Sequence, residues 1–140
     1  MHIPVLLDEV INGLLLKSGD TVVDATLGGA GHARAICEKI GSSGTLIGFD
    51  RDLNAVNRSA VALSECLAKL VIVEANFRNL SQVLLVHGIE SVNAFLFDLG
   101  LSSYQLDESG KGFSFQHDEP LKMTFEINGK INAETIANDW

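Results

Sequence analysis

Three aspartates and a glycine-rich turn are the residues of this chain whose types and spacing could do chemistry. Asp24, Asp50 and Asp98 each end an apolar run, and the turn at residues 28–31 follows the first of them. Glycines adopt backbone angles that other residues resist, and they let a ligand approach the main chain closely. Asp50 stands 22 positions after Gly28, and an acid at about that distance grips a ribose diol in dinucleotide-binding folds. We therefore predict a nucleotide-type cofactor site, with an ordinary tight turn as the alternative.

The position of Asp24 separates two classes of cofactor. A dinucleotide would place an anionic pyrophosphate on the glycine turn, and an acid at the preceding strand end would repel it. S-adenosylmethionine carries a cationic ammonium and sulfonium, which Asp24 would attract. Phe77, after the third apolar run, can stack on or border adenine, although a place in the core is the alternative. We predict S-adenosylmethionine, and keep a nucleotide-dependent oxidoreductase as a further hypothesis.

Asp98 ends the fourth apolar run, where a transferred methyl group would meet its acceptor. A carboxylate there can accept a hydrogen bond from an exocyclic amine and orient its lone pair for in-line attack. Ser102, Ser103 and Gln105 follow closely and supply donors and acceptors for the edge of a base. A capped turn is the alternative interpretation of these three. We predict that Asp98 is the catalytic residue and that Ser102 and Ser103 lie on the substrate side.

Four strands and four helices must bring these residues together. Apolar runs predict strands at 21–24, 45–50, 69–75 and 93–99, and helical spacing predicts helices at 4–16, 33–40, 54–67 and 80–86. Their alternation predicts an α/β fold with a mainly parallel sheet and helices on both faces. The last strand is apolar on both sides and is expected to be buried. The third helix should present one apolar face, formed by Val56, Ala60, Leu63 and Leu67.

Composition and charge limit the function classes. The 140 residues are 46% hydrophobic, which suits one globular domain, and no apolar run approaches the roughly 20 residues that cross a bilayer. No signal peptide is visible. Cys37 and Cys66 lack metal-ligand spacing, so we expect no metal site and interpret them as reduced core thiols of a cytoplasmic protein. A formal charge of −8 means that this segment alone should not hold nucleic acid tightly.

Six segments carry a resemblance more specific than any single motif. They are MHIPVLLDEV, DATLGGAGHA, GFDRD, ANF, FDLGLSSYQLD and GFSFQHDEPLKM, in this order and spacing. Together they resemble the bacterial RsmH (MraW) family over essentially the whole chain. The resemblance implies a Rossmann-like class I methyltransferase fold and S-adenosylmethionine-dependent methylation of the N4 amine of a cytidine in small-subunit ribosomal RNA. It also implies the cofactor contacts, which are Ala30, Gly31, His32, Asp50, Phe77, Asp98 and Gln105.

The resemblance also sets expectations about the limits of this chain. Residues 1–100 are expected to form a partial Rossmann-like cofactor domain, and 101–140 to begin a substrate-side helical region. Family members are about twice as long and carry an acid and an Arg where this chain has Lys122 and Thr124. A truncated or degenerate non-catalytic binding module is therefore the alternative function. We expect residues 1–140 alone to self-associate through an exposed sheet edge or to be marginally stable, and not to methylate RNA.

Overall fold

The computed structural model describes residues 4, 6–101, 106, 109–124 and 131–140. The chain forms two compact units, Met1–Asp98 and Leu99–Trp140. The first unit holds all the described strands. Its elements, in chain order, are α1 (Leu7–Gly13), β1 (Thr21–Asp24), α2 (Gly31–Ile40), β2 (Thr45–Asp50), α3 (Leu53–Ala62), β3 (Lys69–Glu74), the 3₁₀ helix η1 (Phe77–Asn79), α4 (Leu80–Val86) and β4 (Ala94–Leu96). The second unit contains α6 (Ala133–Asp139), which begins with a reciprocal cap between Asn132 and Thr135.

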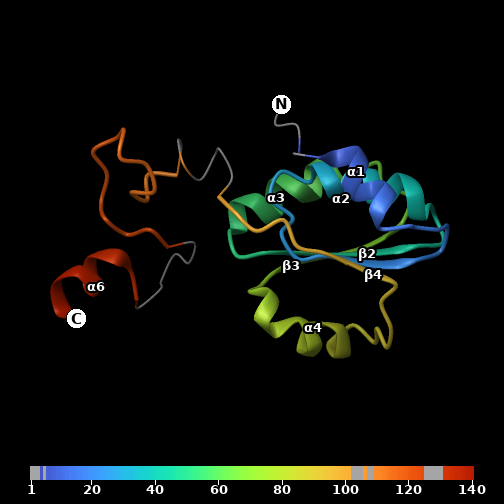
Figure 1. The fold of residues 1–140 in the computed structure, drawn as a ribbon. Coiled ribbons are helices and arrows are strands. Elements are labelled where there is room, and N and C mark those ends of the chain that lie inside the picture. Colours follow the sequence, from blue (N-terminus) through green and yellow to red (C-terminus); the bar gives the residue numbers. More distant parts are fainter. Residues whose placement is uncertain (1–3, 5, 102–105, 107–108, 125–130) are drawn as a thin grey trace. The chain divides into compact units, whose positions relative to one another are not determined.

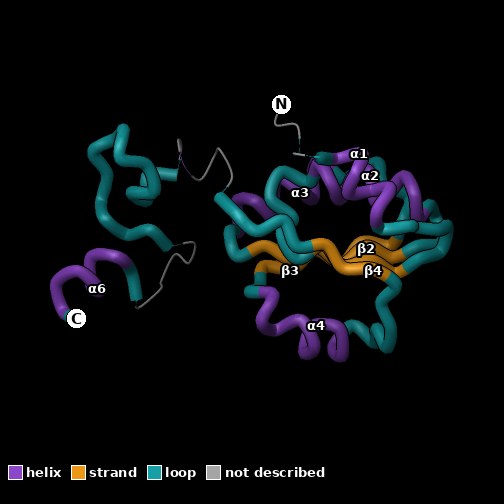
Figure 2. Tube along the Cα trace, in the orientation of Figure 1, coloured by secondary structure: helices purple, strands orange, loops and turns teal. Residues whose placement is uncertain are grey.

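A four-stranded parallel sheet in the order β3-β2-β1-β4 organises the first unit. Helices α1, α2 and α3 cover one face of this sheet and α4 covers the other, as Figures 1 and 2 show. Successive strand residues point to opposite faces, so Val22 and Leu46 join the core beneath α1 and α2. Val23, Ile47 and Phe49 join the separate core beneath α4. The predicted parallel α/β sheet with helices on both faces is confirmed.

The fourth strand differs from the prediction. It covers only Ala94–Leu96, and while Leu96 is buried, Phe95 is 43% exposed. The cause is its place in the sheet, because β1 is its only partner among the described strands. The apolar run predicted a buried strand, and this is wrong for Phe95; the expected exposed sheet edge agrees with the place of β4 at the end of the described sheet.

Helix α3 is shorter than predicted and rotated about its axis. It ends at Ala62 instead of Leu67, which is 79% exposed. Its buried residues are Ala55 and Ser59, so of the predicted apolar face only Leu63, the residue after the helix, is buried. The physical reason is a polar contact: the Ser59 hydroxyl donates a hydrogen bond to the carbonyl of Gly28 at 3.1 Å. A satisfied polar group can occupy a core position that an apolar pattern assigns elsewhere.

The predictions for the start of the first helix and for the state of the two cysteines were also wrong. Helix α1 begins at Leu7 after a left-handed Leu6, so Pro4 lies outside the helix instead of in its first turn. Cys37 and Cys66 are joined in a disulfide and are not the reduced thiols expected from composition. Spacing along two helical segments does not reveal the pairing, because tertiary packing brings the two residues together.

Gly48 lets the glycine loop pack on the centre of the sheet. A side-chain methyl at Gly48 would lie 2.8 Å from one terminal carbon of Leu27, which is itself 3% exposed. We expect Gly48→Ala to lower the free energy of unfolding by about 1–3 kcal/mol, as overpacked cores do, measured by urea denaturation. Gly29→Ala is the matched control, because nothing lies within 4 Å of its added methyl. Equal stability of the two variants would contradict this packing role.

Candidate functional site

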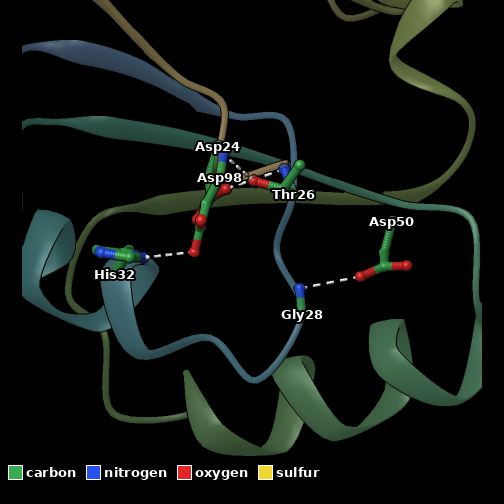
Figure 3. Close-up of polar contacts among 6 residues, drawn as sticks. All are labelled: Asp24, Thr26, Gly28, His32, Asp50 and Asp98. Carbon is green, nitrogen blue, oxygen red and sulfur yellow. Dashed lines mark hydrogen bonds and ion pairs between the residues drawn. The ribbon is translucent and has the colours of Figure 1, made fainter. Parts of the chain in front are cut away.

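The carboxyl ends of three strands bring the three predicted aspartates to one edge of the sheet. Asp24 ends β1, Asp50 ends β2, and Asp98 follows β4 by two residues. Because the strands are parallel, their ends meet at the same edge. Figure 3 shows the side chains of these aspartates around the loop that leaves β1. This edge is therefore the candidate site.

Main-chain hydrogen bonds hold the loop after β1 in one conformation. Leu27 donates its N–H to the carbonyl of Phe49 at 2.9 Å, and Ala30 donates to the carbonyl of Leu27 at 2.7 Å. Gly28 and Ala30 both have positive φ, 50° and 61°, which Gly adopts freely and Ala only under constraint. The tight turn thus exists, and it leads directly into α2. Gly31, the first residue of α2, lies against Pro4, whose ring would overlap any added side chain.

Asp50 fastens this loop to the end of β2. One carboxylate oxygen accepts the N–H of Gly28 at 2.9 Å (Figure 3). The other accepts the N–H of Asp52 at 2.9 Å. A carboxylate has about four acceptor positions, so these two bonds leave capacity for two further donors. Asp50 is only half-buried. It therefore combines a fixed position with room to bind a diol.

Asp24 is the most buried acid of the site. It is 1% exposed and accepts the N–H of Thr26 at 3.0 Å. Burial, helped by the nearby charges of Asp98 and Asp50 and opposed by the Thr26 bond, raises the pKa of Asp24 from 3.8 to about 6. Acidic residues with a raised pKa are common at functional sites. A cation bound beside Asp24 would stabilise its charged form.

Asp98 is held by its main chain and leaves its carboxylate free to act. Its N–H donates to the hydroxyl of Thr26 at 2.8 Å, while its side chain is 60% exposed. One carboxylate oxygen lies 3.7 Å from Nδ1 of His32 (Figure 3). His32 comes from the first turn of α2 and is buried, and among the described residues its Nε2 has no hydrogen-bond partner. Chemical reasoning did not single out His32 or Thr26, and only the resemblance included His32.

Phe77 follows β3 by three residues, at the start of η1, and is 38% exposed. Its ring meets that of Phe97 edge to face, with centroids 5.6 Å apart. Exposed aromatic edges of this kind offer a surface for a planar ring. Phe97 was not predicted, although its place one residue before Asp98 is a signal in the sequence. The predicted residues Ser102, Ser103 and Gln105 lie outside the described residues.

The site suits a cationic ligand with a ribose better than a dinucleotide. Three carboxylates converge on the loop, and a pyrophosphate would face all of them. Asp24 stays the predicted partner of an ammonium or sulfonium, since its burial leaves a negative charge in need of compensation. The unpartnered Nε2 of His32 adds a polar atom that a ligand can satisfy. These residues fit S-adenosylmethionine.

Known proteins resemble this chain in sequence and in fold. The MraW methylase family matches residues 1–140. A ribosomal RNA small subunit methyltransferase H of Paenibacillus sp. (strain JDR-2) is 43% identical over 145 residues, covering 99% of this chain and 46% of the relative. Its counterpart in Acetivibrio thermocellus is 43% identical over 141 residues, covering 99% and 45%. The chain thus spans less than half the length of these curated relatives.

Solved structures share the fold at low identity. An rRNA methylase from Streptococcus thermophilus superposes with a TM-score of 0.58 at 20% identity, over 71% of this chain and 58% of the other. A SAM-dependent O-methyltransferase from Thermotoga maritima superposes with a TM-score of 0.50 at 16% identity, over 55% and 30%. Together with the parallel sheet, these similarities confirm the predicted Rossmann-like methyltransferase fold.

Proposed function

Because the chain belongs to the MraW methylase family, we propose that it binds S-adenosylmethionine at the carboxyl edge of its sheet. We propose further that it serves methylation of the N4 amine of a cytidine in small-subunit ribosomal RNA. The observation that carries the proposal is the buried Asp24 beneath a glycine loop, with Asp50 and Asp98 as charged neighbours. That arrangement favours a cationic cofactor.

The cofactor would be held by residues from three strand ends. Asp50 accepts hydrogen bonds from the ribose hydroxyls, and Asp24 compensates the positive charge. Phe77 borders the adenine, while the turn formed by Gly28, Ala30 and Gly31 lets the cofactor approach the main chain. His32 and Gln105 are further contacts that family resemblance supports. When bound, S-adenosylmethionine supplies a methyl group activated for transfer to a nucleophile.

The chemistry of methyl acceptance falls to Asp98. Its exposed carboxylate can accept a hydrogen bond from an exocyclic amine and so direct the nitrogen lone pair. His32, with Nδ1 at 3.7 Å from one carboxylate oxygen, is the neighbouring side chain that could pair with it. The main-chain bond from Asp98 to Thr26 keeps the residue in place while its side chain works.

The RNA partner requires contacts beyond the cofactor site. Enzymes that modify a base in structured nucleic acid displace it from its stack, at a cost of a few kcal/mol. We propose that residues 101–140, with Ser102 and Ser103, lie on the substrate side and that the remaining contacts come from a longer protein or the ribosomal subunit. Such a protein would act in the cytoplasm. The outer edge of β4 could also pair with a second copy of the chain.

Two measurements test this function. Titration calorimetry of residues 1–140 should show binding of S-adenosylmethionine and none of NAD. Binding of NAD instead would favour the oxidoreductase hypothesis. Transfer of labelled methyl groups to small ribosomal subunits, followed by nucleoside analysis, tests the cytidine N4 assignment in the protein that carries this sequence. Label in another nucleoside would overturn that assignment.

A non-catalytic cofactor-binding module is the second candidate. It is favoured by the charge of −8, which gives residues 1–140 little attraction for RNA phosphates. Binding of S-adenosylmethionine without methyl transfer by any longer protein containing this chain would support it.

Replacing Asp98 should affect the reaction more than the fold. In a longer protein that carries this sequence, we expect Asp98→Ala to lower the single-turnover methylation rate by about 10²–10⁴, the usual contribution of a positioned acid or base. The thermal midpoint should move little, since the structural bond to Thr26 comes from the main chain. Glu90→Ala, at an exposed position after α4, is the matched control. A variant with a normal rate and a lowered midpoint would make Asp98 a structural residue.

A further inference from the structure

A disulfide lies in the wall of a surface hollow away from the aspartates. Cys37 in α2 and Cys66, four residues after α3, are bonded across 29 positions of sequence, with Cα atoms 5.8 Å apart. The hollow has a volume of about 430 Å³ and is lined by residues of α2 and of the end of α3, both cysteines included. The bond is therefore open to small molecules.

The two sulfur-bearing residues are unequally accessible. Cys37 is 5% exposed and belongs to the buried core beneath α1 and α2. Cys66 is partly exposed and packs on the edge of that core. A small reagent entering the hollow therefore meets Cys66 first. Such asymmetry assigns one cysteine to attack and the other to resolution.

We propose that Cys37 and Cys66 form a reversible thiol–disulfide exchange site for low-molecular-weight thiols and disulfides. In the reduced protein, the Cys66 thiolate attacks one sulfur of a small disulfide, forms a mixed disulfide and releases one small thiol. The Cys37 thiolate then attacks the Cys66 sulfur, closes the internal bond and releases the second small thiol. The protein loses two hydrogens, and the small disulfide becomes two thiols.

Charge at the hollow selects the class of reagent. Glu38 and Glu65 line it, and the one lysine or arginine among the lining residues, Arg34, lies 3.9 Å from Glu38. Acidic walls attract cations and repel anions, most strongly at low salt. The site should therefore react faster with a cationic disulfide, such as cystamine, than with anionic oxidised glutathione.

Closing the bond joins α2 to the segment that follows α3, and both helices support the glycine loop. Helix α2 starts with Gly31 of that loop, and α3 reaches it through Ser59, which donates to the carbonyl of Gly28. A cross-link over 29 positions restricts the unfolded chain, so oxidation should raise the thermal midpoint by about 10 °C. The thermal stability of this unit therefore depends on whether the two cysteines are oxidised or reduced.

The test uses residues 1–140, reduced and then exposed to cystamine or oxidised glutathione under native conditions, with intact mass followed over time. Wild type should lose two hydrogens without retaining an adduct. Cys37→Ala should keep a mixed disulfide at Cys66, and Cys66→Ala should stay unmodified. Glu65→Lys should speed the glutathione reaction about threefold to tenfold at low salt. Glu90→Lys, an equal charge change after α4, should not.

Several results would overturn the proposal. If wild type stays reduced while circular dichroism shows a folded chain, Cys37 and Cys66 are not an exchange site. Equal modification of Cys37→Ala and Cys66→Ala would remove the assigned order of attack. If Cys37→Ala does not fold, the proposal is still tested by the mass of the wild-type product and by the rates at which wild type reacts with the two disulfides. A faster reaction with oxidised glutathione would refute the charge selection.

Discussion

Asp50→Ala is expected to weaken binding of S-adenosylmethionine about tenfold to a hundredfold. Loss of a charge-assisted hydrogen-bond partner costs about 1.5–3 kcal/mol, which corresponds to that range of affinity. The same carboxylate also holds the N–H groups of Gly28 and Asp52, so its removal loosens the loop as well as the ribose contact. Titration calorimetry of residues 1–140 measures the total.

Two variants separate these contributions. Asp50→Asn keeps an acceptor oxygen for one main-chain N–H but removes the negative charge, so an intermediate loss is expected. Glu74→Ala is the control, because Glu74 is the register partner of Asp50 on β3 and is exposed. Unchanged affinity in a folded Asp50→Ala variant would place the ribose elsewhere.

Asp24→Asn should stabilise the chain at neutral and higher pH, and it should weaken the binding of S-adenosylmethionine. The folded pKa of Asp24, about 6, lies above its ordinary value of 3.8, so the fold favours the protonated carboxyl. Stability from this group is fully present below about pH 4 and is lost as the pH rises through 6. The loss approaches about 3 kcal/mol by pH 8, at 1.36 kcal/mol per unit. Asparagine stays neutral and retains an oxygen for the Thr26 N–H.

Urea denaturation between pH 4 and pH 8 measures this effect. The variant should exceed wild type by about 1–3 kcal/mol at pH 8 and match it near pH 4. Wild-type affinity for S-adenosylmethionine should fall as the pH drops below 6, since protonation of Asp24 removes the negative charge that attracts the cationic cofactor. Asp118→Asn, exposed in the second unit, is the control. A variant that is less stable than wild type at pH 8 would mean that Asp24 is buried for a structural purpose.

Local patterns in the sequence determined the architecture and most of the candidate site. The apolar run between Gly44 and Asp50 predicted β2 with its observed bounds, and a short helix was predicted with the observed bounds of α4. These predictions succeed because strand and helix periodicity is a local property of neighbouring residues. Parallel strands then require their carboxyl ends to share one edge, which brings Asp24, Asp50 and Asp98 to that edge, and the strand order β2-β1-β4 makes them neighbours.

Contacts between residues far apart in the chain were decided by tertiary structure alone. The pairing of Cys37 with Cys66, the bond from Ser59 to Gly28, and the approach of His32 to Asp98 join residues 29, 31 and 66 positions apart. The pairing of β4 with β1 likewise depends on how the strands dock, and not on the apolar composition of β4. No local pattern specifies such contacts, because each depends on how the helices dock on the sheet. The burial that raises the pKa of Asp24 has the same origin, since an aspartate in isolation has no interior to be buried in.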